Sequence, residues 1–381
     1  MTISGTAAIV GAAQLDTYRT QGRSPVGVMS VAVVRALADA GLGLEDVDGL
    51  FTSSSYYAMP SLTLGEYLGV HPTYSDTTSV GGCAFVAQLG HAAAAIQAGL
   101  CSVAVVAYGS TQRSDAGTLV SMAEQSAYEA PYGLLHPVGA FGMVAQRHMA
   151  QYGTTSEQLA ELAVAARQWS LLVDDAPFDV PLTVDDVLSS RMICSPLHKL
   201  DCCLVTDGGG AVVLTSAERA RDLSPHPVYL LGAGEAINHR NFAQMPDLTS
   251  TQAGNSSARA LDMAGVKLQE IDTVHVYDAF TISLLVLLED LGFCAKGEGG
   301  AFASDGALAP GGRLALNTNG GGLSYTHPGM LSMFLIIEAV QQLRGTAGKR
   351  QVPGARLSLV HGMGMTLAAH ATAVLSSNPR A

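Results

Sequence analysis

Apolar positions along the chain follow a helical period in some segments and form short continuous runs in others. Residues 35–48 and 259–272 each read as an amphipathic helix that is stopped by a glycine and followed by a short turn. An apolar strand is then expected at 49–53 in the first case and at 273–277 in the second. The two segments align without a gap, and this internal match predicts a duplicated chain.

The match extends in both directions along the chain. Each half contains an opening strand, a glycine pair before an apolar helix, a buried strand and a closing strand. In the first half these are residues 8–14, 81–99, 102–110 and 207–216; in the second they are 229–235, Gly321-Gly322 with the helix after Pro328, 356–364 and 369–377. Alternating apolar strands and helices predict an α/β fold in which helices cover the sheets. The helices that begin near Gly82 and His327 are apolar on most faces and are expected at the buried centre.

One long segment, from residue 111 to about 200, has no counterpart in the second half. It holds the single tryptophan, Trp169, and an irregular stretch at 174–181. Long insertions are more often functional than idle, so this one is expected to cover a substrate. The predicted organisation is therefore an N-terminal half, residues 1–224 with the inserted loop region 111–200, and a C-terminal half, residues 225–381.

Composition narrows the class of protein. The chain has 381 residues, of which 48% are hydrophobic and 14% charged, as is typical of a well-buried globular core. The net charge of −12 and the lack of a dense basic stripe argue against nucleic-acid binding, although a coenzyme A thioester could still bind at local basic spots. No apolar run of about 18 residues predicts a membrane span, and the first residues do not resemble a signal peptide. The six cysteines form no CxxC pair, so we expect free thiols, a cytoplasmic protein and no metal site.

A glycine-rich loop at residues 317–330 reads Asn-Thr-Asn-Gly-Gly-Gly-Leu-Ser-Tyr-Thr-His-Pro-Gly-Met. Pro328 suits the first turn of a helix, so the pattern predicts that His327 lies at a helix N-terminus beside free backbone donors. Such a place can hold a developing negative charge. A glycine-rich turn with a capping histidine is the alternative. No phosphate-binding or dinucleotide-binding glycine pattern occurs, so we expect no cofactor beyond the coenzyme A of a substrate.

In combination these features resemble the thiolase superfamily, in its sterol-carrier-protein-type branch, also called lipid-transfer proteins, and most of all the aldolases that cleave steroid side chains. The resemblance covers nearly the whole chain. It is carried by the duplication, the insertion and four phrases: Asp207-Gly-Gly-Gly-Ala-Val-Val-Leu-Thr-Ser, Tyr277-Asp-Ala-Phe, Thr326-His-Pro-Gly and His361-Gly-Met-Gly. It implies a duplicated five-layered αβαβα fold with an inserted loop domain. It also implies a homodimer paired through edge strands of the first half, for which 73–80 is the candidate segment.

The thiolase catalytic groups are a nucleophilic cysteine, an asparagine, a histidine and a second cysteine. Carried onto this chain, the nucleophile position falls on Gly82, with Cys83 one residue later. The asparagine position is Tyr277, the histidine is retained as His327, and the second cysteine position is His361. A shift of one residue turns a helical side chain by about 100°. We therefore expect Cys83 to point away from the site and to pack as a small apolar residue.

An oxyanion site without a nucleophile suits retro-aldol cleavage of a β-hydroxyacyl-CoA. That reaction needs a base for the hydroxyl proton, an acid for the enolate carbon and a cradle for the enolate oxygen. We expect His327 to hold the thioester oxygen, Tyr277 or Tyr325 to accept the proton, and His361 to donate to the enolate or reprotonate it. A purely structural role remains open for both tyrosines and for His361. Substrate contacts are expected at Gly82, Cys83, Gly322 and Gly362.

The resemblance also implies a substrate and a partner. The substrate would be a 17-hydroxy steroid side-chain CoA thioester, cleaved to a 17-ketosteroid and propionyl-CoA. The partner would be a protein with a zinc-ribbon and an OB-fold domain. Two alternatives stay open: a true thiolase or acyltransferase, perhaps using Cys83, and a non-catalytic subunit that binds acyl-CoA or sterol.

Overall fold

The computed structural model describes the chain except for residues 1, 16–17, 19, 21, 116–126 and 381. The strands of the first half are β1 (Ala7–Leu15), β2 (Gly49–Thr52), β3 (Tyr74–Asp76), β4 (Val103–Ser110) and β7 (Gly208–Ser216). Those of the second half are β8 (Val228–Ile237), β9 (Thr273–Val276), β10 (Leu357–Gly364) and β11 (Ala369–Ser376). The helices outside the insertion are α1 (Pro25–Asp39), α2 (Pro60–Leu68), α3 (Ala84–Gln97), α7 (Ala217–Leu223), α8 (Ala253–Ala264), α9 (Thr281–Asp290), α10 (Gly299–Ala303), α11 (Gly321–Ser324) and α12 (Ser332–Arg344).

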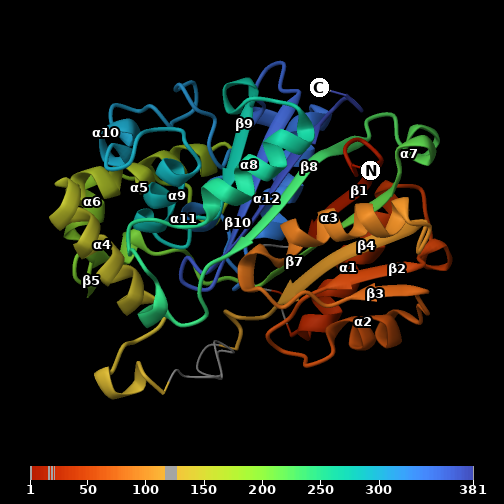
Figure 1. The fold of residues 1–381 in the computed structure, drawn as a ribbon, viewed down its shortest axis with the longest axis horizontal. Helices are drawn as coiled ribbons and strands as arrows, with labels where there is room; N and C mark the ends of the chain where they lie inside the picture. Colours follow the sequence, from red (N-terminus) through yellow and green to blue (C-terminus); the bar gives the residue numbers. More distant parts are fainter. Residues whose placement is uncertain (1, 16–17, 19, 21, 116–126, 381) are drawn as a thin grey trace.

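The strand order shows the duplication directly. The strands form one sheet in the order β3-β2-β4-β7-β1-β8-β11-β10-β9 (Figure 1). The two half-sheets are joined where β1 pairs with β8, at Ala8–Tyr229 and Ile9–Val228. Going outward from this joint, β8, β11, β10 and β9 repeat β1, β7, β4 and β2. A parallel bridge from Val274 to Leu316 stands where the first half has β3. The predicted duplication is confirmed.

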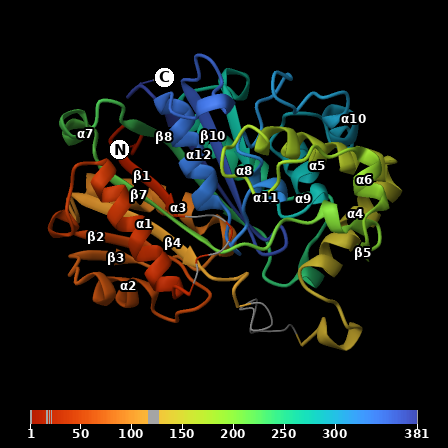
Figure 2. The ribbon, with the colours of Figure 1, turned by 180° about the vertical axis from the view of Figure 1, so that it is seen from behind.

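Five layers follow from how the helices pack. Helices α3 and α12 both contact strands of the two halves and lie between them. Helix α1 covers the outer face of β1, β4 and β7, whereas α8 covers β8 and β11 (Figure 1 and Figure 2). The side chains of α12 are buried nearly all round, because both half-sheets press on it. The α/β fold with central helices, as the sequence predicts, is confirmed.

The inserted region is more helical than its sequence predicts. Its described part contains α4 (Val138–Tyr152), α5 (Ser156–Ser170), α6 (Val184–Ser189) and the short hairpin of β5 (Met192–Cys194) and β6 (Leu197–His198). A reciprocal cap starts α5, since the Thr155 hydroxyl accepts from the Gln158 amide and the Gln158 side chain accepts from the Thr155 amide. Trp169 is buried and donates its indole N–H to the Leu308 carbonyl at 2.8 Å. The stretch 174–181 is irregular, as predicted, while 116–126 lies outside the described residues.

The segment expected to pair two copies contains a short strand at the sheet edge. Strand β3 pairs only with β2, so its other side is open within the described chain. The dimer itself stays a prediction. In the part of the chain that the structure describes, no helix is both long enough and apolar enough to cross a membrane. All six cysteines are free thiols, as expected.

Candidate active site

The glycine-rich loop does not lead into a helix at His327. Helix α12 begins only at Ser332. Gly329 has a φ of 92°, in the left-handed region, which a right-handed helix cannot include. His327 instead lies in an irregular stretch, where its N–H donates to the Thr206 hydroxyl at 3.1 Å and its carbonyl accepts from the Thr206 N–H at 3.3 Å. The prediction of a helix start at His327-Pro328 is therefore wrong.

A buried carboxylate holds the loop in place. Asp278 is fully buried and accepts from the Gly322 amide at 2.7 Å and from the Leu323 amide at 3.2 Å. Burial raises the pKa of Asp278 to about 7. A Cβ on Gly321 would overlap this carboxylate, which is one reason that glycine is needed there. The Tyr277-Asp-Ala-Phe phrase and the glycine-rich loop are thus physically coupled, and Asp278 is structural.

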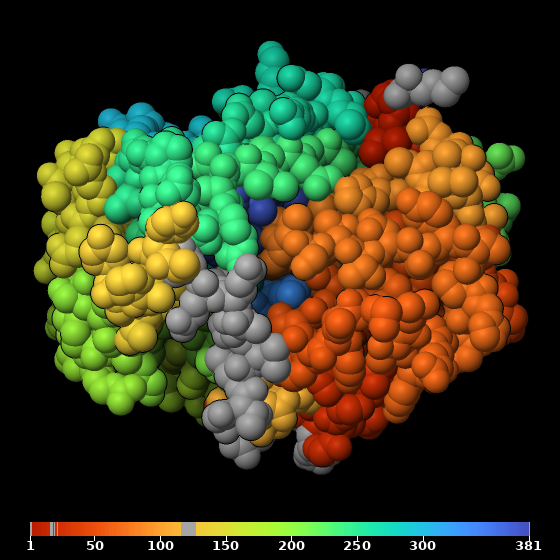
Figure 3. Space-filling model, turned by 60° about the horizontal axis from the view of Figure 1, so that its bottom comes forward, coloured from red at the N-terminus to blue at the C-terminus, as the bar shows by residue number. Residues whose placement is uncertain are grey.

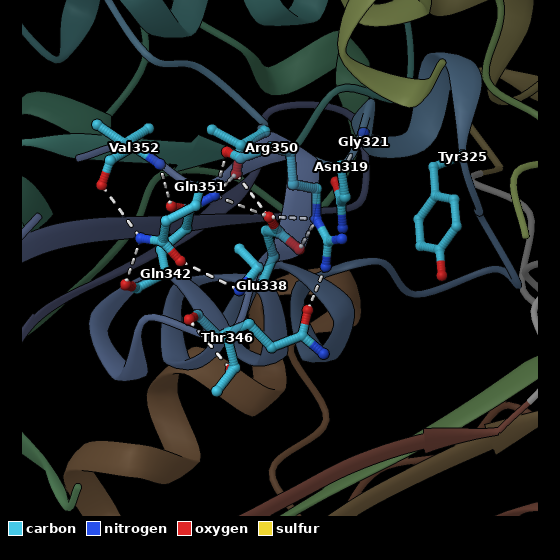
Figure 4. A network of polar contacts seen from close by, with 12 residues as sticks. Asn319, Gly321, Tyr325, Glu338, Gln342, Thr346, Arg350, Gln351 and Val352 are labelled. Atoms are coloured by element: carbon cyan, nitrogen blue, oxygen red, sulfur yellow. Dashed lines mark hydrogen bonds and ion pairs between the residues drawn. The ribbon is translucent and has the colours of Figure 1, made fainter. Parts of the chain in front are cut away.

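From the opposite side, α12 anchors the start of the loop. Glu338 accepts from the Thr318 hydroxyl at 2.6 Å and from Arg350 Nε at 2.9 Å. Gln342 Nε2 also donates to the Thr318 hydroxyl, at 2.9 Å. Figure 4 shows this network from close by. The loop that carries His327 is therefore fixed at both its beginning and its middle.

Tyr277 and His327 share a cavity of about 210 Å³. Their rings meet edge to face, with centroids 5.5 Å apart and planes at 85°. The Tyr277 hydroxyl donates to the Gly329 carbonyl at 3.3 Å. Most of the remaining wall is apolar and comes from the insertion and the second half: Phe141, Ala279, Phe280, Met330, Met363 and Met365. On the face drawn in Figure 3 the surface is hollowed between orange and green segments, with blue atoms of the C-terminal half at the bottom of the hollow.

The tyrosine occupies the space that a nucleophile would need. A Cβ built on Gly82 would lie 2.6 Å from the Tyr277 hydroxyl oxygen and 2.7 Å from the Met363 carbonyl oxygen. Position 82 can therefore carry no side chain while Tyr277 is present. Cys83 does not line the cavity; its Sγ lies 3.3 Å from the Val80 carbonyl, and burial raises the pKa of its thiol to about 12. It points away from the site, as the one-residue shift implies.

Burial sets the protonation states of the two cavity groups. It lowers the pKa of His327 to about 4 and raises the pKa of Tyr277 well above its ordinary value of 10. At neutral pH the imidazole and the phenol are both uncharged. The Nε2 atom of His327 is buried and has no hydrogen-bond partner among the described residues. Unpaired buried polar atoms are rare, and this one belongs to a residue that lines the cavity.

Two other candidates lie outside this cavity. The Tyr325 hydroxyl accepts from Gln14 Nε2 at 2.6 Å, and the side chain is 1% exposed. His361 is fully buried, with Nδ1 2.8 Å from the Thr372 hydroxyl and Nε2 3.2 Å from His370 Nδ1. Both side chains already have internal partners. The structure thus brings Gly82, Tyr277 and His327 together, and leaves Tyr325 and His361 away from them.

The expected glycine contacts divide in the same way. Gly82 borders the cavity, whereas Gly322 and Gly362 do not. The Gly322 amide is used by Asp278, and a Cβ on Gly362 would overlap the backbone of Cys83. Both glycines therefore serve close packing.

Five polar residues of the cavity wall were not expected from the sequence: Ser55, Gln112, His136, Cys203 and Thr366. His136 Nε2 lies 3.1 Å from a carboxylate oxygen of Glu129. Gln112 and His136 belong to the insertion, which has no internal counterpart for comparison. The sequence signal was limited to the ionisable residues Glu129 and His136, and the sequence does not say what these side chains face.

Comparisons with known proteins identify the family of the chain. Residues 234–377 match the model of the thiolase C-terminal domain-like family. The 17-hydroxy-3-oxo-4-pregnene-20-carboxyl-CoA lyase of Mycobacterium tuberculosis is 36% identical over 91% of this chain and 93% of its own length. The steroid side-chain-cleaving aldolase of Thermomonospora curvata is also 36% identical, over 91% of this chain and 92% of its own.

A solved structure extends the match to three dimensions. The structure of the Ltp2-ChsH2(DUF35) aldolase superposes with a TM-score of 0.89 and 33% identity, covering 98% of each chain. Fold, duplication and length all correspond. The chain belongs to the thiolase superfamily, in the branch that includes the steroid side-chain-cleaving aldolases.

Proposed function

We propose that this protein is a carbon–carbon lyase that cleaves a β-hydroxyacyl-CoA by a retro-aldol reaction. One observation carries the proposal: Tyr277 fills the space beside Gly82 in the cavity that also holds His327. A thiolase needs a thiolate there to carry the acyl group. With a phenol and an imidazole in that place, the groups beside Gly82 offer proton-transfer and oxyanion chemistry, and burial raises the pKa of the wall thiol Cys203 far above its ordinary value.

The reaction balances without a further reactant. The β-hydroxyl loses its proton, its oxygen becomes a ketone, and the bond between the α and β carbons breaks. The electron pair of that bond forms the thioester enolate, which then takes a proton at the α carbon. A tertiary 17-hydroxyl with a three-carbon side-chain thioester would yield a 17-ketone and propionyl-CoA.

The ionisation of the two cavity groups supports an assignment of roles. His327 is a neutral imidazole with a buried, unpaired Nε2, so it is the better acceptor for the hydroxyl proton. Tyr277 retains its proton, so it is the better donor to the enolate oxygen. The sequence-based expectation gave these two side chains the opposite roles. The reason for exchanging them is the protonation state at neutral pH together with the unpaired Nε2: the imidazole is uncharged and can accept a proton, whereas the phenol keeps its own.

A steroidal acyl group is supported by the wall of the cavity and by the relatives. The wall is mainly aromatic and methionine side chains, which suit a rigid apolar ligand. The two relatives named above carry the names of enzymes that act on steroid side chains. We extend that substrate class to this chain.

A partner protein belongs to the same proposal. The structural neighbour Ltp2 is paired with ChsH2(DUF35) in its solved structure. We propose a homodimer of this chain, joined through β3, that binds a partner with zinc-ribbon and OB-fold domains. The open edge of β3 within the described chain supports the dimer.

The test is co-expression with such a partner, followed by an assay with a 17-hydroxy steroid side-chain CoA thioester. We expect propionyl-CoA and a 17-ketosteroid in equal amounts, and retention of activity after iodoacetamide treatment. Thiolytic release of acetyl-CoA that iodoacetamide abolishes would instead identify a thiolase. Tight binding of the thioester without turnover, with the partner present, would identify a binding subunit.

A further inference from the structure

A directed chain of hydrogen bonds crosses the second half behind the cavity. His370 Nε2 lies 3.2 Å from the Leu367 carbonyl, which can only accept, so this nitrogen carries the proton. His370 Nδ1 must then accept from His361 Nε2 at 3.2 Å, and His361 Nδ1 must accept from the Thr372 hydroxyl at 2.8 Å. The chain begins at Thr372, because the Ser256 hydroxyl, 2.9 Å from that of Thr372, donates its own proton to the Ala253 carbonyl at 2.9 Å. Each of the three links from Thr372 to the Leu367 carbonyl has one proton, and both imidazoles are neutral.

The chain ends on a turn with an unfavourable backbone. Met365 and Leu367, in the connection between β10 and β11, both have a φ of 55° although neither is glycine. L-residues rarely adopt the left-handed region, and a turn with two of them needs external support. Histidines provide that support on two neighbouring carbonyls. His370 holds the Leu367 carbonyl, and His239 Nε2 donates to the Thr366 carbonyl at 3.1 Å.

The same turn shapes the wall of the cavity. Met363, Met365 and Thr366 line it. A Cβ on Gly81 would lie 3.0 Å from both Gly364 Cα and Met365 N, so the turn rests directly on the glycine pair that faces Tyr277. A displacement of the turn would therefore move the wall opposite the Tyr277 hydroxyl.

We propose that His361 and His370 are positioning residues that lock the turn at residues 363–367 in its left-handed conformation and so set the distance between Gly82 and Tyr277. They do not touch the substrate. The kinetic consequence rests on the proposed function, whereas the conformational consequence does not.

The experiment compares His370→Leu, which removes the hydrogen bonds, with His370→Gln, whose amide nitrogen can still reach the Leu367 carbonyl. The matched control is His275→Leu on β9, because His275 is also fully buried and neither ring nitrogen has a partner among the described residues. Hydrogen exchange of the backbone amides at 363–368 is measured by mass spectrometry in the complex with the partner. kcat and KM are measured on the same samples.

We expect His370→Leu to accelerate exchange in this peptide about tenfold or more and to lower kcat about tenfold. His370→Gln should stay within about threefold of wild type in both, and His275→Leu should leave the peptide unchanged. Equal exchange in all three variants would overturn the proposal, even if the wild-type protein proves to have no lyase activity. If the wild-type protein has no lyase activity but the variants show the expected exchange pattern, the proposed function is wrong and the positioning role of the histidines stands.

A second variant covers the case in which His370→Leu does not fold. Thr372→Val removes only the hydroxyl that donates to His361 Nδ1 and keeps the shape of the side chain. Faster exchange at residues 363–368 than elsewhere in β10 and β11 supports the proposal. Exchange that is unchanged there, or faster uniformly across both strands, overturns it.

Discussion

The two halves of the molecule build their central helices alike, yet they contribute differently to the cavity. Ahead of α3, the first half presents Gly81 and Gly82, which are backbone without side chains. Ahead of α12, the second half presents His327, and the end of β9 leads to Tyr277. The two side chains to which we assign the proposed chemistry therefore both come from the second half. A side chain from the second half occupies the space that the first half leaves empty, so the two positions depend on each other.

The largest expected effect comes from refilling that space. Gly82→Ala would place a methyl group against the Tyr277 ring and the Met363 carbonyl. We expect a destabilisation of about 1–3 kcal/mol or more, because overpacking a closed site forces backbone shifts. kcat/KM should fall about a thousandfold, because Tyr277 must leave its position.

Gly139→Ala in α4 is the control for this substitution, since its Cβ would meet only the Leu134 and Leu135 side chains. It should be neutral or slightly stabilising. Thermal unfolding and the propionyl-CoA assay measure both effects. A Gly82→Ala protein with normal activity would show that positions 82 and 277 do not depend on each other.

Removing the phenol tests the second half directly. Tyr277→Phe keeps the packing and should lower kcat about a hundredfold, as is usual when a positioned proton donor is lost. Tyr325→Phe is the matched control, because that hydroxyl is bonded to Gln14 outside the cavity. It should stay within about threefold of wild type. A larger loss for Tyr325→Phe than for Tyr277→Phe would contradict the geometry.

The pH dependence distinguishes the two possible bases. The pKa of His327 is lowered to about 4, so the imidazole is neutral above that pH and is lost as a base only as pH falls through 4. If His327 is the base, kcat/KM should be level between about pH 5 and pH 8 and should fall about tenfold per pH unit below about 4. A rate that rises tenfold per unit through the alkaline range would assign the base to tyrosinate. Unfolding must be monitored in parallel at acid pH.

The smallest expected effect concerns the remaining sulfur of the first half. Cys83→Ala removes a buried thiol that faces the Val80 carbonyl, so kcat/KM should remain within about twofold of wild type. The stability cost should be about 1 kcal/mol, from one lost buried group. Mass spectrometry of the enzyme during turnover should find no acyl adduct on Cys83. An acyl adduct on Cys83 would show that the first half does supply a nucleophile.

The sequence alone was sufficient for the architecture. Hydrophobic period and internal matching predicted the repeated strands and the two central helices, because these depend on the same local rules in both halves. The sequence predicted the local backbone conformation less well. The helix expected at His327 is prevented by the left-handed Gly329, and the inserted region proved largely helical. A proline at a helix start and a glycine in a positive-φ turn give conflicting local signals, and the packing of the loop decides between them.

For the site, the sequence by itself determined which residue types stand at which repeat positions: glycine at 82, tyrosine at 277 and histidine at 327. Tertiary structure decided which of them meet. Tyr277 and His327 are 50 positions apart in the chain and share a cavity with Gly82, while Tyr325, two residues before His327, faces Gln14. Tertiary structure also made His361 part of a buried hydrogen-bond chain. The physical reason is that burial and hydrogen-bond partners, and with them the pKa values, are properties of the packed state and are absent from any local stretch of sequence.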